Sequence, residues 1–201
     1  MSPSALSFNG GETVKRLLFL LLVLAGISVF AGVFVSFDCF LGVGVSQRLI
    51  IEAEEKRIDA FTNYGVQFNF DYGLHRGLRF GAIVSSQNFS VRFGDESLNF
   101  ALFCLGFEGM FVMDFLDLVL QVSGEGHWVL GSISCEDGIL SQADHTGNLF
   151  AGKVMFEKFL SENLSVAVGG GLKFLLVKNA TLSMDLSGFI PYAVLRIGYS
   201  F

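Results

Sequence analysis

The side chains most capable of chemistry gather in one segment, residues 125–147, of this 201-residue chain. They are His127, Trp128, Cys135, Glu136, Asp137, Asp144 and His145. Imidazole, thiolate and carboxylate groups are the usual ligands of transition metals, but these residues follow no recognised ligand spacing. We interpret the segment as a solvated acidic loop, with Trp128 at a membrane interface. We predict neither a metal site nor a cofactor.

Composition narrows the class of protein to which those residues belong. The chain has 13 Lys and Arg against 19 Asp and Glu, a net charge of -6, and no basic cluster, which argues against nucleic-acid binding. With 52% hydrophobic residues it is too apolar for a disordered protein, and its length fits one domain. The three Cys residues cannot all pair within one disulfide framework. The hydrophobicity therefore requires a buried core or contact with lipid.

The N-terminus has the layout of a secretory signal. Lys15 and Arg16 precede a run without charge, Leu17 to Phe37. Val29 and Ala31 are small residues at the -3 and -1 positions of a cleavage after Ala31. We predict a signal peptide over residues 1–31 and a mature domain over 32–201. An uncleaved membrane helix is the alternative, since about 20 apolar residues suffice to span a bilayer.

Beyond this run the sequence alternates between apolar and polar residues, which is the pattern of β-strands. From Tyr64 to Tyr72, even positions are aromatic or aliphatic and odd positions are Gly, Gln, Asn or Asp. The stretch from Leu164 to Leu176 repeats this pattern. Phe residues that recur every four positions from Phe103 to Phe115 fit either a helix face or a strand face, and the interspersed Gly residues favour a strand.

The strands predicted from this pattern number eight and lie at about 40–48, 61–71, 78–93, 98–112, 116–124, 148–157, 164–177 and 189–201. Tight connections over 72–77, 113–116 and 157–163 alternate with longer ones over 49–60, 94–97, 125–147 and 178–188. Long strands with an apolar face and short connections on one side only are typical of transmembrane barrels. We predict an all-β fold, an eight-stranded antiparallel up-and-down transmembrane β-barrel with both ends on the periplasmic side.

Charges of both signs fall on the predicted inward face. The polar inward set is Asn69, Asp71, Arg79, Glu108, Gln121, Lys153, Lys173 and Arg196. An eight-stranded barrel is just wide enough for side chains to fill, and isolated buried charges are costly. We predict a lumen plugged by a salt-bridged network of Asp71, Arg79, Glu108, Lys153, Lys173 and Arg196. A specific path for an ion or ligand is the alternative.

The C-terminal strand resembles that of bacterial outer-membrane β-barrels. Phe201 closes the chain, with Tyr199, Ile197 and Leu195 at alternate positions before it. The turn over 159–166 is similar to periplasmic turns of the small OmpA-like and opacity-type barrels. The resemblance covers about 40–201. It implies a location in the bacterial outer membrane, contact with its lipid, and recognition of Phe201, Tyr199, Ile197 and Leu195 by the barrel-assembly machinery.

The resemblance also indicates an expected function, because functional residues usually lie on the loops of a rigid scaffold. We expect a structural, surface-presenting barrel whose outer loops mediate adhesion or contact with a host or surface ligand. A narrow channel for small or apolar solutes is the alternative, and Lys173 and Arg196 would then affect uptake. A lipid-modifying enzyme is the second alternative. Some outer-membrane lipid A deacylases place a Ser two residues after a His, but Gly147 follows His145 here. We therefore predict no catalytic residue.

Overall fold

The computed structural model describes residues 32–75, 77–136, 139–181 and 183–201. These residues form the strands β1 (Val33–Val43), β2 (Ser46–Ile51), β3 (Glu54–Lys56), β4 (Ala60–His75), β5 (Leu78–Phe93), β6 (Glu96–Phe115), β7 (Leu118–Glu136), β8 (Ile139–Ala143), β9 (His145–Phe159), β10 (Leu164–Asn179) and β11 (Met184–Ser200). In the described part of the chain, no helix is long and apolar enough to cross a membrane. The signal peptide predicted over 1–31 lies outside the described residues and stays a prediction.

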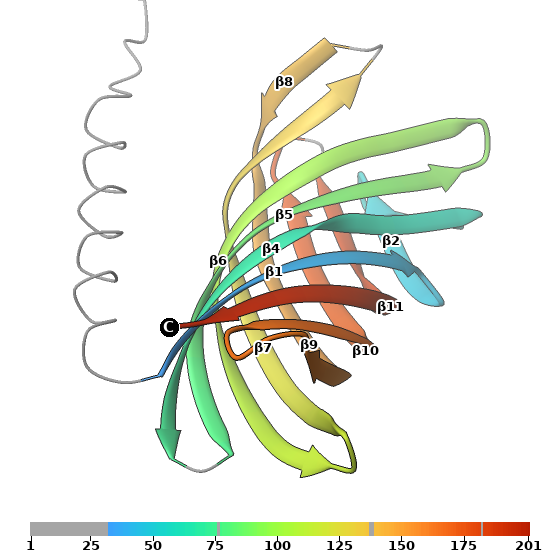
Figure 1. Cartoon of the computed structure of the whole chain (residues 1–201). Helices are drawn as coiled ribbons and strands as arrows, with labels where there is room; N and C mark the ends of the chain where they lie inside the picture. Colours follow the sequence, from blue (N-terminus) through green and yellow to red (C-terminus); the bar gives the residue numbers. More distant parts are fainter. Residues whose placement is uncertain (1–31, 76, 137–138, 182) are drawn as a thin grey trace, which may run out of the picture. The chain divides into compact units, whose positions relative to one another are not determined.

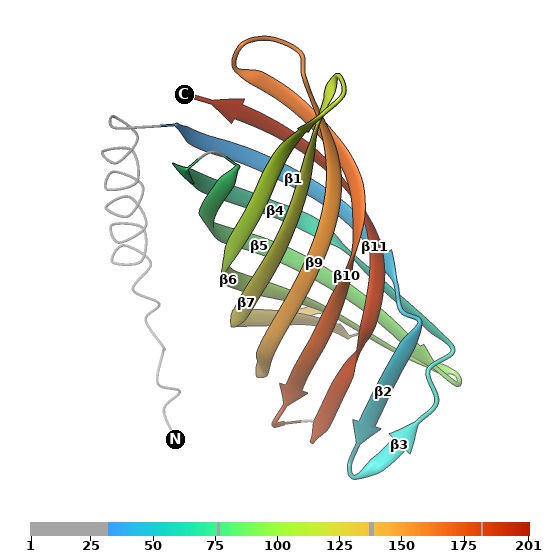
Figure 2. The ribbon, with the colours of Figure 1, turned by 90° about the horizontal axis from the view of Figure 1, so that it is seen from below.

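Eight of these strands close into a barrel (Figures 1 and 2). Neighbours pair antiparallel in the order β1-β4-β5-β6-β7-β9-β10-β11, and β11 also pairs with β1. The closing register joins Phe34 to Ser200 and Gly42 to Tyr192. The predicted all-β, eight-stranded antiparallel up-and-down barrel is therefore confirmed. The Phe residues of 103–115 lie on the single strand β6, which confirms the strand interpretation.

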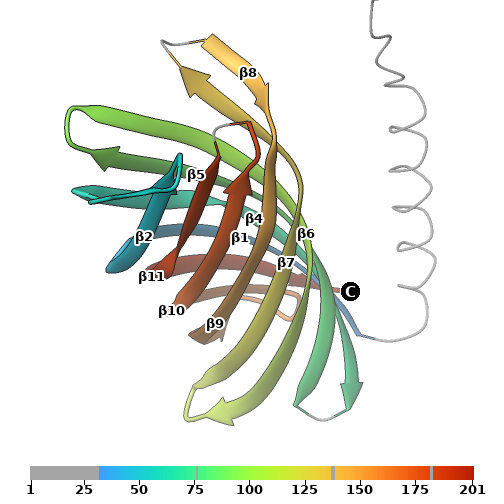
Figure 3. The ribbon, with the colours of Figure 1, turned by 180° about the vertical axis from the view of Figure 1, so that it is seen from behind.

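Three short strands lengthen the wall at the end far from residues 33 and 201, which we call the outer end (Figure 3). β2 continues the path of β1 along β11 and pairs Ser46 with Phe189. β3 folds back on β2. β8 pairs with the distal part of β7 and leads through Asp144 into β9. We call the opposite end, where residues 33 and 201 lie, the terminal end.

Strand β5 keeps its odd-numbered residues toward the lumen along its length, but its apolar residues change from the outward face to the inward face between the two ends of the barrel. On β5, Phe80 and Val84 are about half exposed near the terminal end, whereas Phe89 and Val91 are buried inside the barrel near the outer end. Successive strand residues face opposite sides, so this change from even to odd positions moves the apolar face from outside to inside. Strand β6 shows the same change of phase between its outer and terminal parts.

The outward apolar residues of the terminal half form a continuous band, which we call the apolar belt. Its larger exposed members are Leu41, Tyr64, Phe68, Tyr72, Phe80, Val84, Phe103, Phe107, Phe111, Val122, Trp128, Phe150, Val154, Phe156, Val168, Leu172, Phe189, Leu195, Ile197 and Tyr199. Water-soluble proteins rarely expose a contiguous apolar surface of this extent. A closed barrel leaves no backbone edge unpaired, so the belt can face hydrocarbon at no cost in hydrogen bonds.

The inward apolar residues of the outer half form a packed cluster, which we call the outer core. It consists of Leu49, Phe61, Phe89, Val91, Leu98, Phe100, Leu102, Cys104, Leu149, Leu175, Val177, Met184, Leu186 and Ile190. The ring of Phe89 lies 6.0 Å from that of Phe61 and stacks 5.0 Å from that of Phe100. The outer part of the lumen is therefore filled with hydrocarbon side chains.

Two predicted boundaries are wrong, for different reasons: the uncharged run Leu17 to Phe37 hides the start of the first strand, and the alternation changes phase within 125–147. The predicted strand 40–48 begins earlier, at Val33, and breaks between Val43 and Ser46. The predicted loop 125–147 is almost entirely strand, because β7 runs to Glu136 and β9 starts at His145. Beyond the apolar belt the outward residues become polar, so the alternation changes phase and resembles the end of a strand. Pairing with neighbouring strands continues nonetheless.

Candidate functional site inside the barrel

Five charged side chains meet inside the terminal half of the barrel, and we call them the ionic plug: Asp38, Glu108, Glu125, Lys153 and Arg196. Lys153 Nζ lies 2.9 Å from Asp38 Oδ2 and 3.2 Å from Glu108 Oε1, and it also pairs with Glu125. Arg196 donates to Asp38 at 2.6 and 2.8 Å and to Glu108 at 3.3 Å. Each of these side chains is almost completely buried.

Strand register brings the ionic plug together. Asp38 on β1 lies directly opposite Arg196 on β11, across the seam that closes the barrel. Glu108 on β6 lies opposite Glu125 on β7, a repulsive pair that Lys153 from β9 neutralises. The desolvation cost of buried charges is offset only when the charges are paired and hydrogen-bonded, and the plug meets both conditions.

Polar side chains outside the plug complete its hydrogen bonding. Gln67 Nε2 donates to Glu125 Oε1 at 3.1 Å, and His127 Nε2 lies 3.0 Å from Glu125 Oε2. A separate carboxylate, Glu157, accepts from Gln121 at 2.6 Å and from Ser165 at 2.5 Å. The terminal half of the lumen is thus crosslinked between strands on opposite sides of the barrel.

Three of the residues predicted for the lumen network lie in the ionic plug: Glu108, Lys153 and Arg196. The other two plug residues, Asp38 and Glu125, are not among the predicted lumen residues. Asp38 precedes the predicted start of the first strand, and Glu125 begins the predicted loop. The alternation of Gln121, Ser123, Glu125 and His127 on one face of β7 is the signal that could have found Glu125.

Lys173 is buried at the boundary between the ionic plug and the outer core. Its ammonium donates to Asn63 Oδ1 and Gln87 Oε1, each at 3.2 Å. It also lies 3.1 Å from the centroid of the Phe40 ring and 4.7 Å from that of Tyr192. Two neutral oxygens and two aromatic faces therefore surround this cation, in place of a carboxylate.

Asp71 and Arg79 lie in the lumen apart from the plug. Asp71 is buried, and its Oδ1 has no hydrogen-bond partner among the described residues. It faces Gly81, where any side chain would collide with Oδ1. The Arg79 guanidinium stacks 3.6 Å above the Phe34 ring, beside a hollow of about 610 Å³ at the terminal mouth.

The structure places the residues of segment 125–147 differently from the predicted loop. His127 is buried in the lumen, whereas Trp128 lies on the belt, edge-on to Phe107 with ring centroids 5.5 Å apart. His145 is buried against Phe100, and Asp144 accepts a hydrogen bond from Thr181 at 2.8 Å. The backbones of Cys135 and Glu136 belong to β7, and Asp137 lies outside the described residues.

His145 and Ser132 lie in contact, yet their hydrogen bonds run in the wrong direction for a nucleophile. Ser132 Oγ donates its proton to the carbonyl of Ala143 at 2.6 Å. It therefore accepts from both the backbone NH and the Nδ1 of His145, at 3.0 and 3.2 Å. A general base would have to accept the hydroxyl proton. This contact fixes the junction of β8 and β9. No group of three or more metal-ligating side chains occurs in the described ranges.

The C-terminal residues lie on the belt at the terminal end. Leu195, Ile197, Tyr199 and Phe201 are all about half exposed or more. The rings of Tyr199 and Phe201 meet edge-on at 4.9 Å, and Phe201 NH donates to Val33 O at 3.1 Å. Their recognition by the assembly machinery stays a prediction.

Solved structures with a similar fold are outer-membrane barrels. Neisserial surface protein A, NspA, is 11% identical over 85% of this chain and 97% of its own, with a TM-score of 0.50. The fold is that of a small outer-membrane barrel. The outer membrane protein OprG from Pseudomonas aeruginosa is 13% identical over 85% and 96%, with a TM-score of 0.54. No family model and no curated protein matches the chain. The predicted resemblance is confirmed at the level of the fold.

Proposed function

We propose that this chain is a bacterial outer-membrane protein that presents a rigid, water-exposed β-structured platform at the cell surface. The platform would mediate adhesion or contact with a host or surface ligand. The observation that carries this proposal is the change of phase along the strands. It gives the outer half a polar exterior and a packed interior, as in a soluble β-protein.

The outer hairpins support a rigid platform. β5 and β6 continue well past the apolar belt and are connected by only Gly94 and Asp95. Their outward side chains there are polar: Ser90, Arg92, Ser97 and Asn99. The β2–β3 hairpin ends on Glu54 and Lys56, whose side chains pair at 2.6 Å. A surface held by strands loses little entropy when a partner binds.

The lumen supports a closed scaffold better than the alternative of a narrow channel. A solute would have to break the ion pairs of the plug and then displace the outer core. Both layers fill the lumen with side chains from opposite walls. The lipid-modifying enzyme has less support, because Ser132 donates its proton to a carbonyl and not to His145.

Attachment assays with cells that express the protein test the proposal. Replacing the outward polar residues Ser90, Ser97 and Asn99 with Lys should abolish attachment to the surface that cells with the unmodified protein bind. The barrel should stay intact, as shown by a mobility shift between heated and unheated samples on a gel. Lys in place of Ser161, Glu162 and Asn163, in the turn at the terminal end, is the control and should leave attachment unchanged. Unaffected attachment in the first variant, or a steady large conductance of the protein in planar bilayers, contradicts the proposal.

A further inference from the structure

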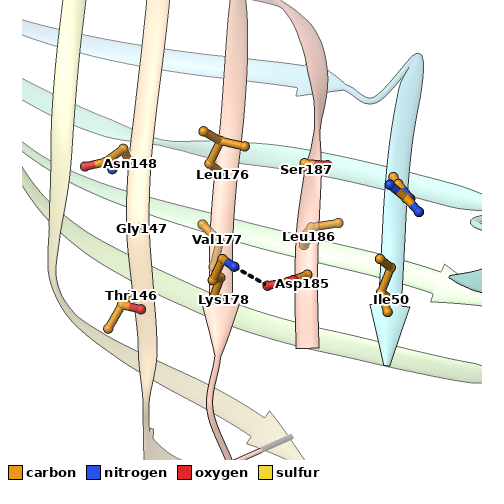
Figure 4. A pocket seen from close by; sticks show the side chains of 11 residues that line it. Ile50, Thr146, Gly147, Asn148, Leu176, Val177, Lys178, Asp185, Leu186 and Ser187 are labelled. Atoms are coloured by element: carbon orange, nitrogen blue, oxygen red, sulfur yellow. Dashed lines mark ion pairs between the residues drawn. The ribbon is translucent and has the colours of Figure 1, made fainter. Parts of the chain in front are cut away.

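A hollow of about 620 Å³ lies on the outside of the barrel across β9, β10, β11 and β2 (Figure 4). We call it the outer groove. Its outward side chains are Arg48, Ile50, Thr146, Asn148, Leu176, Lys178, Asp185 and Ser187. We propose that the outer groove binds the phosphorylated saccharide headgroup of a lipid in the outer leaflet. The inference rests on the proposed placement in the outer membrane.

The position of the groove matches a lipid headgroup. On β9, the outward residue next to Asn148 toward the terminal end is Phe150, and on β11 the one next to Ser187 is Phe189. Phe189 packs against Phe174 of β10, with ring centroids 4.8 Å apart. The groove therefore begins where the apolar belt ends. A lipid whose acyl chains lie against these rings places its headgroup in the groove.

The cationic side chains of the groove come from two strands and form only exposed ion pairs. Arg48 pairs with Glu55 at 3.6 Å and Lys178 pairs with Asp185 at 3.3 Å, and each of the four side chains is more than half exposed. Exposed ion pairs contribute little to stability, so a phosphate can replace the carboxylates at small cost. Arginine in particular binds phosphate oxygens with two parallel hydrogen bonds.

The neutral groups indicate a sugar as well as a phosphate. Thr146 and Ser187 contribute hydroxyls, and Asn148 contributes an amide that donates and accepts. Once Lys178 binds phosphate, Asp185 is free to accept hydrogen bonds from sugar hydroxyls. Inorganic phosphate alone would leave these groups without a ligand atom.

The chain carries a natural probe at the edge of the groove. Trp128 is the only tryptophan, and it lies directly opposite Asn148 in the β7–β9 pairing. The full chain, purified in detergent micelles, is titrated with lipopolysaccharide that carries a fluorescence quencher, and the emission of Trp128 is measured. The variant Arg48→Ala/Lys178→Ala should bind at least about tenfold more weakly, since it loses two charge-assisted contacts.

The control variant Arg57→Ala/Arg92→Ala removes the same charge from exposed outer positions that do not line the groove. It should keep the affinity of the unmodified chain, and both variants should keep their heat-dependent gel mobility. Dephosphorylated lipopolysaccharide should bind weakly, and inorganic phosphate should not compete at equal concentration. An equal loss in both variants, no loss in the groove variant, or full competition by phosphate overturns the proposal. The assay uses micelles, so it does not depend on cell attachment.

Discussion

The terminal half of the barrel carries apolar side chains outside and charges inside, whereas the outer half carries polar side chains outside and apolar ones inside. The same strands build both halves, and only the phase of their alternation differs. In lipid the exterior must be apolar, so the interior holds the polar residues and requires ion pairs. In water the exterior is polar, and the interior packs like an ordinary protein core. The phase change therefore marks where the strands leave the membrane.

The largest expected loss in the free energy of unfolding comes from a substitution in the ionic plug. Lys153→Met removes the cation that contacts Asp38, Glu108 and Glu125, and leaves excess negative charge buried. We expect the free energy of unfolding to fall by about 3–5 kcal/mol, the usual result of breaking a buried ion pair. Urea unfolding of the barrel in lipid vesicles measures the change. A loss below about 1 kcal/mol would mean that water reaches the plug and screens it.

A cavity in the outer core should lower the free energy of unfolding as it does in the core of a water-soluble protein. Phe89→Ala opens a cavity between Phe61 and Phe100, and should lower the free energy of unfolding by about 3 kcal/mol. The matched control is Phe80→Ala, on the outward face of the same strand, which opens no cavity in the outer core. Limited proteolysis from the outer side should cut the β5–β6 hairpin in the first variant only. If the β5–β6 hairpin is cleaved equally in Phe80→Ala, the outer half does not have a packed core of its own.

A pair of arginine substitutions locates the boundary between the halves. Val168→Arg places a charge on the belt, and should lower the free energy of unfolding by about 2 kcal/mol or more. Ser90→Arg, on the outward face beyond the belt and between Thr62 and Asn99, should cost between 0 and about 1 kcal/mol. Equal costs at the two sites in vesicle unfolding would place both in the same medium, and would contradict the boundary.

A similarly small change in the free energy of unfolding is expected when Lys173 is replaced. Unlike Lys153, it binds two neutral oxygens and two aromatic rings. In Lys173→Met, the desolvation cost of a buried ammonium disappears along with two hydrogen bonds, so the free energy of unfolding should change by about 1 kcal/mol or less. Measured beside Lys153→Met, this variant tests whether carboxylate partners decide the cost of losing a buried lysine. A loss as large as that of Lys153→Met would contradict this explanation.

Local pattern was enough to predict most of the terminal half. Alternation over 64–72 and 164–176 set which residues face outward, and the same pattern on other strands placed Glu108, Lys153 and Arg196 on the inner face. The side-chain period of a strand follows from backbone geometry, so it can be read without knowing the partner strands.

The outer half could not be predicted in the same way. Where the medium changes from lipid to water, apolar residues move from the outward to the inward positions of a strand, and polar residues take the outward positions. The sequence pattern therefore predicts a loop that contains His127 and His145, although strand pairing places both inside the barrel.

The sequence by itself determined the strand period, the number of barrel strands and the sign of the charges available to the lumen. Only the tertiary structure decided which charges pair, because Asp38 meets Arg196 through the register of the seam and Lys153 reaches across to three strands. The outer core and the outer groove likewise arise from residues far apart in the chain. Contacts between strands depend on register and closure, and neither is encoded in the period of a single strand.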